Sequence, residues 1–273
     1  MLQRITRLVR RLGRERRPVR YLTSRVLWFG GVSRWFAVRR AGDAPGGYRV
    51  RFFPSSVSSY AWVYPDDVNE EEAFVARTLR PGQTYVDVGA NVGLLALRAA
   101  SVVGPGGSVV AVEAHPRTAS FLRGNVDMNG FGNVAVESCA VGDARGTVWF
   151  SDLHSDDQNG VDPARRGLEV PVIPLDELLP PSRVPHVHLL KVDVEGFELH
   201  ALRGARELLS RVDRILIESS TGHCARYGYE AREVYDLLRQ AGFRLRRLGD
   251  TAEIAADFVP TGAENLVGER TAA

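Results

Sequence analysis

The sequence predicts a doubly wound α/β fold, in which a mostly parallel sheet is covered by helices on both faces. From Thr84 onward, short apolar segments of strand length alternate with longer segments of helical periodicity. The strand segments are apolar throughout, which is typical of parallel strands buried on both sides. With 273 residues, 44% of them hydrophobic, the chain can bury a full core in one large domain.

Residues 1–40 form a basic arm. They contain twelve Arg and one acid, Glu15, a balance of +11, whereas the other 233 residues hold 23 bases and 32 acids, a balance of −9. Within residues 1–20 the apolar residues recur at helical spacing until Pro18, which predicts a basic amphipathic helix. Such a helix suits an anionic membrane surface, an acidic carrier protein or the rim of the active site; a solvated arm is the alternative. The acidic body argues against a nucleic-acid partner.

Four aromatic residues follow the arm, and we expect them to form a cap that packs on the body: Trp28, Phe29, Trp35 and Phe36. Residues 41–80 are expected to contain a strand pair, "YRVRFF" and "SYAWVY", separated by Pro54 and Ser55. A helix then follows in "DDVNEEEAFVARTLRPG", with acids in its first turn and Pro-Gly at its end. The main domain is expected to span residues 81–273.

Five strands and three helices are predicted in the main domain. The strands are residues 84–89, 108–114, 134–141, 186–194 and 214–219, and the helices are residues 92–103, 118–129 and 198–210. "FRLRRLG" and "ENLVGER" are expected to close the sheet as an antiparallel pair. In such folds ligands bind at the carboxyl ends of the strands, where the strand order reverses.

Composition narrows the class of protein. The sequence contains no run of about 18 apolar residues, so it predicts no membrane-spanning helix. The arginine-rich arm does not resemble a secretory signal. We therefore expect a cytoplasmic protein, with peripheral membrane attachment through the arm left open. Cys139 and Cys224 lack metal-binding spacing, so no metal site and no disulfide framework is predicted.

The turn after the first strand, Gly89 to Gly93, predicts a ligand site. A phosphate-binding P-loop is rejected, because Gly93 is followed by leucines rather than by Lys and Ser or Thr. NAD is disfavoured, since Asn91 stands where the second glycine of the dinucleotide fingerprint belongs. Asp87 before the turn suits a ligand ammonium group, and Glu113 at the next strand end suits two ribose hydroxyls. S-adenosylmethionine carries both groups.

Several motifs together resemble the FkbM family of S-adenosylmethionine-dependent methyltransferases. They are "VDVGANVG", "VVAVEAHPRTASFLRGNVDMNG", "AVGDARGTVWF", "PLDELL", "LLKVDVEGFELHALRGARELL" and "RILIES", and they cover roughly residues 70–220. The resemblance implies a Rossmann-like class I methyltransferase fold with a seven-stranded sheet and S-adenosyl-L-methionine as cofactor. It also implies methylation of a hydroxyl group on a natural product or a sugar.

Carried over by position, the family motifs assign cofactor-binding roles to six residues. Asp87, Gly89, Asn91 and Gly93 would hold the methionine end, Glu113 the ribose, and Asp143 would lie near the adenine. The catalytic residues are expected among Lys191, Asp193, Glu195, Glu218 and His223. Lys191, Asp193 and Glu195 alternate with apolar residues, so they share one face of an extended strand.

Lys191 is the only lysine in a chain that contains 34 arginines, which suggests that this position requires an ammonium group rather than a guanidinium group. An ion pair with Asp193 or Glu195 is the structural alternative. The base that removes the acceptor proton stays open among Asp193, Glu195, Glu218 and His223. Also open are N-methylation, the identity of the acceptor, assembly into a homodimer, and a non-catalytic scaffold recruited through the arm. The polar segment 151–167 is expected to border the acceptor.

Overall fold

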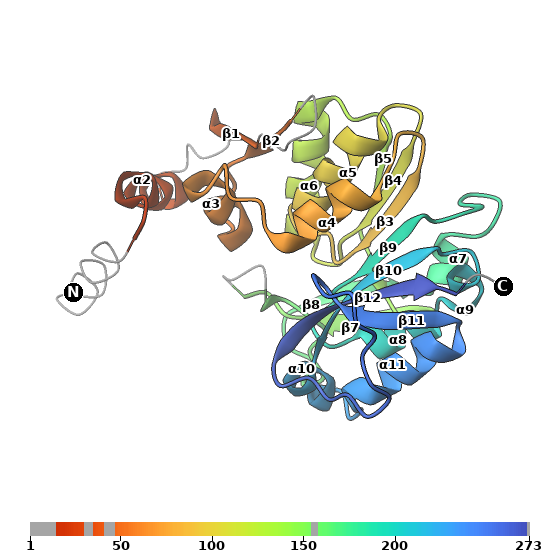
Figure 1. Ribbon diagram of the computed structural model, residues 1–273. Coiled ribbons are helices and arrows are strands. Elements are labelled where there is room, and N and C mark those ends of the chain that lie inside the picture. Colours follow the sequence, from red (N-terminus) through yellow and green to blue (C-terminus); the bar gives the residue numbers. More distant parts are fainter. Residues whose placement is uncertain (1–14, 30–34, 41–46, 154–157, 272–273) are drawn as a thin grey trace.

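A seven-stranded sheet forms the centre of the molecule in this computed structural model (Figure 1). The structure describes residues 15–29, 35–40, 47–153 and 158–271. The strand order is β11-β12-β10-β9-β3-β4-β5, and only β12 runs antiparallel to its neighbours. The strands are β3 (Thr84–Val88), β4 (Ser108–Val112), β5 (Val134–Glu137), β9 (Leu189–Val192), β10 (Arg214–Ser220), β11 (Phe243–Arg247) and β12 (Ala263–Arg270). The predicted doubly wound fold and its terminal antiparallel pair are confirmed.

Helices cover both faces of this sheet, as the strand pattern requires. One apolar cluster joins α4 (Glu70–Thr78), α5 (Leu94–Val103) and α6 (Pro116–Asn129) to alternate strand residues such as Tyr85 and Leu189. A second cluster joins α8 (Glu198–Arg203), α9 (Arg206–Leu209), α11 (Ala231–Gln240) and the short α7 (Leu175–Leu178) to the intervening residues, such as Val86 and Leu190. Neighbouring strand residues thus enter different cores. Asp87 lies on the same face as Tyr85, toward α4 and α5.

Two predicted elements are divided in the structure. The helix expected over residues 198–210 is interrupted at Gly204, where a Cβ atom would lie 2.0 Å from the Gly142 carbonyl oxygen. The strand expected over residues 134–141 splits into β5 and β6 (Ala140–Val141). A separate three-stranded sheet, which the sequence did not predict, combines β6 with β7 (Gly146–Phe150) and β8 (Leu168–Ile173). This small sheet carries the polar segment between β7 and β8 to the edge of the main sheet.

The N-terminal extension differs from the prediction in three respects. A helix that the sequence did not predict, α2 (Pro18–Phe29), begins at Pro18, because proline is well tolerated in a first helical turn. The predicted strand "SYAWVY" is wrong: the chain forms helix α3 (Ser56–Val63), and the Ser55 side chain caps it by accepting from the Ser58 amide. The strand partner of β2 (Tyr48–Arg51) is instead β1 (Ala37–Arg40), so a hairpin bridges the boundary expected at residue 40.

The aromatic cap is also largely wrong as predicted. Phe29 and Trp35 are 80% and 76% exposed, and Phe36 is 42% exposed. The arm prediction for residues 1–14 lies outside the described residues. Among the described residues, the structure contains no helix with the length and apolar character to cross a bilayer.

A buried ion pair fixes the hairpin to the main domain. Arg40 donates to the Glu72 carboxylate at 2.7 Å and to the backbone carbonyl of Tyr64 at 3.2 Å. Tyr48 donates to the other Glu72 oxygen at 2.5 Å. All three side chains are nearly inaccessible to solvent, so Glu72 on α4 is the point to which β1 and β2 attach. The extension therefore holds α4 at the edge of the site described next.

Candidate active site

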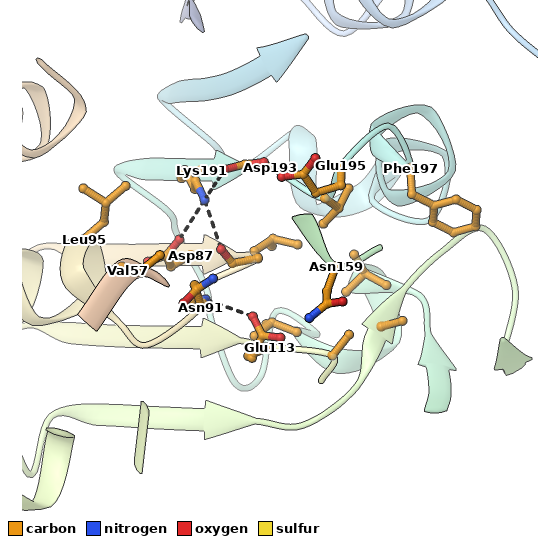
Figure 2. A pocket seen from close by; sticks show the side chains of 18 of the residues that line it. Val57, Asp87, Asn91, Leu95, Glu113, Asn159, Lys191, Asp193, Glu195 and Phe197 are labelled. Atoms are coloured by element: carbon orange, nitrogen blue, oxygen red, sulfur yellow. Dashed lines mark hydrogen bonds and ion pairs between the residues drawn. The ribbon is translucent and has the colours of Figure 1, made fainter. Parts of the chain in front are cut away.

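A cavity lies at the carboxyl ends of β3, β4 and β9, where the strand order reverses (Figure 2). It contains about 1140 Å³ of empty space, part of which is open to solvent. The strand ends and the turn after β3 form its floor, α3 and α4 contribute one wall, and the segment after β7 contributes another. This is the position at which ligands bind in doubly wound sheets.

The turn after β3 lines the cavity with Gly89, Ala90 and Asn91. Gly89, Asn91 and Gly93 all have positive φ angles, of 78°, 51° and 95°. A Cβ atom on Gly89 would lie 1.8 Å from the carbonyl oxygen of Asp193, so β9 packs against this turn too closely for any side chain. Gly93 serves a different purpose, because its Cβ would lie 2.3 Å from Leu122 of α6 and it does not line the cavity.

Asp87 and Lys191 are direct neighbours on β3 and β9. The Lys191 ammonium lies 3.1 Å from Asp193 and 3.8 Å from Asp87, and it donates to the Gly89 carbonyl at 3.1 Å. Figure 2 shows it between the two carboxylates. Burial lowers the pKa of Lys191, but Asp193, Asp87 and Glu71 outweigh that effect and raise the pKa above its usual value. Lys191 is therefore a permanent cation that holds the turn, and it is not suited to act as a base.

The Asp87 carboxylate is buried, and the described residues donate no hydrogen bond to it. Its side chain is 1% exposed, and neither oxygen accepts a hydrogen bond of normal geometry from the described residues. Burial raises its pKa to about 6; Lys191 opposes this shift, while Asp193 and Glu71 add to it. A buried carboxylate in this condition is costly unless a ligand cation completes it.

Glu113 is held by backbone amides at the end of β4. One oxygen accepts from the Asn91 amide at 2.9 Å and the other from the His115 amide at 2.8 Å. Each carboxylate oxygen has a second lone pair, so the group can accept further hydrogen bonds from ligand hydroxyls. The two amide bonds fix its orientation at the cavity floor.

Asn159 is a site residue that sequence reasoning missed. Its side-chain oxygen accepts from the Leu153 amide at 2.8 Å and from the Ser151 hydroxyl at 3.1 Å. Its amide nitrogen is buried and has no hydrogen-bond partner among the described residues, and in Figure 2 the nitrogen points toward Glu113. A buried donor of this kind is expected to find its partner in a ligand. Glu71 was missed too, although acids in the first turn of α4 were recognised.

A second cavity adjoins the first and shares Glu195 and Val161 with it. Glu195, Glu218 and His223 meet there, with one nitrogen or oxygen of each within 4.8 Å of the others. His223 Nδ1 lies 3.4 Å from the Glu195 carboxylate. Glu195 is held at a φ of 56°, and the following Gly196 has no room for a side chain, since a Cβ would lie 2.6 Å from the His223 carbonyl oxygen.

The protonation equilibria in the second cavity are displaced from their ordinary positions. Burial raises the pKa of Glu218 to about 8, the charges of Asp193 and Glu195 add to the shift, and Lys191 opposes it. Burial lowers the pKa of His223, as does Arg226, while Asp193 opposes the shift. At neutral pH Glu218 is therefore mostly protonated and His223 is mostly neutral.

The structure thus brings together most of the predicted site residues. Seven line the first cavity: Asp87, Gly89, Asn91, Glu113, Lys191, Asp193 and Glu195. Glu218 and His223 line the second. Asp143 lines neither; its side chain is about half exposed and lies 3.5 Å from His200 in an ion pair. The wall near Glu113 is formed instead by Cys139, Ala140 and Val141.

Comparison with known proteins identifies the family. A family model described as the methyltransferase FkbM domain matches residues 87–245. The chain belongs to the FkbM methyltransferase family. S-adenosyl-L-methionine is therefore its cofactor, as the sequence predicted.

Individual relatives of this FkbM protein are distant. A hexuronic acid methyltransferase, AglP of Haloferax volcanii, is 27% identical over 199 residues, which are 71% of this chain and 78% of the relative. A solved FkbM methyltransferase from Methylobacillus flagellatus is 18% identical with a TM-score of 0.44, over 78% of this chain and 53% of that one. Aeropyrum pernix fibrillarin, solved with S-adenosyl-L-methionine, is 14% identical with a TM-score of 0.44, over 73% and 76% of the two chains.

The residues of the first cavity fit this cofactor. The Asp87 carboxylate, whose oxygens accept no hydrogen bond from the described residues, matches a ligand ammonium, and the Glu113 carboxylate matches a pair of ribose hydroxyls. The apolar wall of Ala140 and Val141 matches a flat heterocycle, and the free amide nitrogen of Asn159 offers one more donor.

Proposed function

We propose that this FkbM protein methylates a hydroxyl group of a sugar or of a related hydroxylated small molecule. The observation that carries the proposal is the second cavity, which meets the cofactor cavity at Glu195. Its lining includes four carboxylates and two guanidinium groups: Asp152, Asp162, Glu195, Glu218, Arg166 and Arg226. Carboxylates accept hydrogen bonds from neighbouring hydroxyls, whereas they repel an acceptor carboxylate held next to them.

The likeness to a hexuronic acid methyltransferase supports a sugar as the acceptor class. A uronic acid offers two kinds of oxygen, its hydroxyls and its carboxylate. Arg166 is engaged by Asp162 at 3.0 Å and Arg226 is balanced by Glu195, while Glu218 is mostly protonated at neutral pH. This charge balance favours transfer to a hydroxyl over transfer to a carboxylate. The alternative of a non-catalytic scaffold draws no support from the family match.

We infer that His223 is the base, among the four residues that the sequence left open. The Glu195 carboxylate beside Nδ1 favours the tautomer with the proton on Nδ1, which leaves the lone pair of Nε2 to accept the hydroxyl proton. Glu218, protonated at neutral pH, can donate a hydrogen bond to a neighbouring acceptor oxygen. Lys191 and Asp193 hold the turn and the strand end in position.

The bound cofactor supplies an activated methyl group on a sulfonium, so the protein's main task is alignment with exclusion of water. Asp87, the Gly89–Gly93 turn and Glu113 are proposed to fix the cofactor. The junction at Glu195 then brings an acceptor oxygen in the second cavity next to it. In this arrangement Asp87 binds the cofactor and His223 accepts the proton of the acceptor hydroxyl. Variants of Asp87 are therefore expected to lose cofactor binding, and variants of His223 are expected to lose methyl transfer.

The test is methyl transfer from isotopically labelled S-adenosyl-L-methionine to a panel of neutral sugars, uronic acids and aromatic alcohols. Label in a sugar that survives mild alkali indicates an ether and supports the proposal. Label released as methanol indicates a methyl ester on a carboxylate and contradicts it. The His223→Gln variant is the matched control, because it is expected to bind S-adenosylhomocysteine normally while losing transfer.

A further inference from the structure

Helix α2 has an apolar stripe on the side that faces away from the protein. Val19, Leu22, Val26 and Phe29 are 73%, 41%, 68% and 80% exposed. Their spacing of three, four and three residues places all four on one face of the helix. The residues that pack inward are different ones: Tyr21, Ser24 and Leu27 are buried, and α2 contacts α3.

Side-chain contacts fix the helix that carries this stripe to the rest of the protein. Arg20 donates to the Trp62 carbonyl at 2.8 Å, Arg17 pairs with Asp66 at 3.0 Å, and the indole nitrogen of Trp62 donates to Thr23 at 3.1 Å. These contacts tie one side of α2 to α3 and the segment after it. The stripe therefore has a defined direction, and Figure 1 shows α2 at the end of the molecule opposite the C-terminal strands β11 and β12.

Positive charge is concentrated in the part of the sequence that contains α2. Residues 1–40 carry a balance of +11, against −9 for the rest of the chain. Arg16 is exposed beside the start of α2, and the Arg25 guanidinium lies 4.9 Å from the Trp28 ring centre. An exposed Trp35 follows the helix at 76% exposure. Arginine, exposed aromatic residues and an apolar stripe are the composition of helices that lie in a membrane interface.

We propose that α2 is a docking surface for an anionic lipid bilayer, with the stripe Val19, Leu22, Val26 and Phe29 seated among the headgroups. The positive arm is attracted to an anionic surface, and the acidic body is repelled from it, so the charge distribution orients the molecule with α2 toward the lipid. A second copy of the chain is a poorer occupant, because it would add a second segment with a sequence balance of +11 to the first. This proposal is independent of the methyl acceptor.

The experiment is vesicle flotation of the full chain with neutral phosphatidylcholine vesicles and with vesicles containing about one third phosphatidylglycerol. The expected result is binding to the anionic vesicles that weakens as salt is raised. The double variant Val26→Glu with Phe29→Glu is expected to lose at least about tenfold in vesicle affinity, because it places two carboxylates against the anionic surface. Val259→Glu is the matched control, since Val259 is 63% exposed but lies far along the chain from α2.

Affinity for S-adenosylhomocysteine, measured in each variant, reports whether the main domain stays folded. Equal binding to neutral and anionic vesicles, no binding to either, or an equal loss in the double variant and the control overturns the proposal. Dimerisation in analytical ultracentrifugation that disappears in the double variant overturns it as well, in favour of a second copy. Binding to an acidic protein but not to anionic vesicles assigns the surface to a protein partner and also overturns the proposal.

Discussion

Substituting Asp87 by Asn is expected to stabilise the protein and weaken its cofactor site at once. The raised pKa of about 6, against an ordinary value of 3.8, means that ionised Asp87 is disfavoured in the folded state. The stability that the folded protein has with Asp87 protonated is fully present below pH 3.8, and it is lost as the pH rises through about 6 and Asp87 ionises. At pH 7 the difference of roughly two pKa units corresponds to about 3 kcal/mol. Asn escapes that cost, although its buried amide without partners costs about 1–2 kcal/mol.

The net gain of the Asp87→Asn variant at pH 7 is therefore about 1–2 kcal/mol, or about 2–6 °C in Tm for a domain of this size. Its affinity for S-adenosylhomocysteine is expected to fall by about tenfold or more, because an ammonium loses its charged partner. Thermal unfolding of the free protein between pH 4 and 8 measures the first effect and calorimetric titration the second. Asp236→Asn, on the exposed side of α11, is the control. A variant less stable than the parent, with a gap that does not change toward pH 4, would refute the reasoning and make the Asp87–Lys191 pair a net stabiliser.

Three further predictions concern the acceptor site, the cofactor site and the extension. His223→Gln should lower the rate of methyl transfer by about a hundredfold at unchanged S-adenosylhomocysteine affinity; because the pKa of His223 is lowered, the acid limb of the parent's pH–rate profile should lie below 6.5 and vanish in the variant. Asn159→Asp keeps the acceptor for Leu153 and Ser151 but removes the free donor, so calorimetry should show about tenfold weaker cofactor binding. Arg40→Met leaves Glu72 buried and unpaired, and denaturant unfolding should show a loss of about 3–5 kcal/mol.

The main sheet could be predicted because its signals are local. Strands that are buried on both faces are apolar along their whole length, and the polar residues that break this rule, Asp87 and Lys191, lie at the ligand edge. The pairing of these two residues across β3 and β9 depends on strand register, which no sequence spacing reveals. Lys191 on β9 consequently contacts the turn after β3, where it donates to the Gly89 carbonyl.

The elements that were missed depend on contacts distant in the sequence. "SYAWVY" has the aromatic content of a strand, but the Ser55 cap and packing against α2 make the segment helical. Asn159 reaches the cofactor cavity only because β7 and β8 form a sheet of their own. The exposure of Phe29 and Trp35 was not predicted, because aromatic residues are normally buried. Exposed apolar residues of this kind indicate an interaction surface, which depends on how α2 packs and not on the sequence alone.

The single lysine of the chain has a practical consequence for chemical labelling. Side-chain amines react with acylating reagents only when they are deprotonated and accessible, and Lys191 is neither, since its side chain is 6% exposed and its pKa is raised. Acylation of this one residue therefore requires the Lys191 ammonium to leave its carboxylate partners, lose its proton and become accessible. The rate of that modification, followed by mass spectrometry, measures how often Lys191 becomes accessible, and no other lysine contributes to the signal.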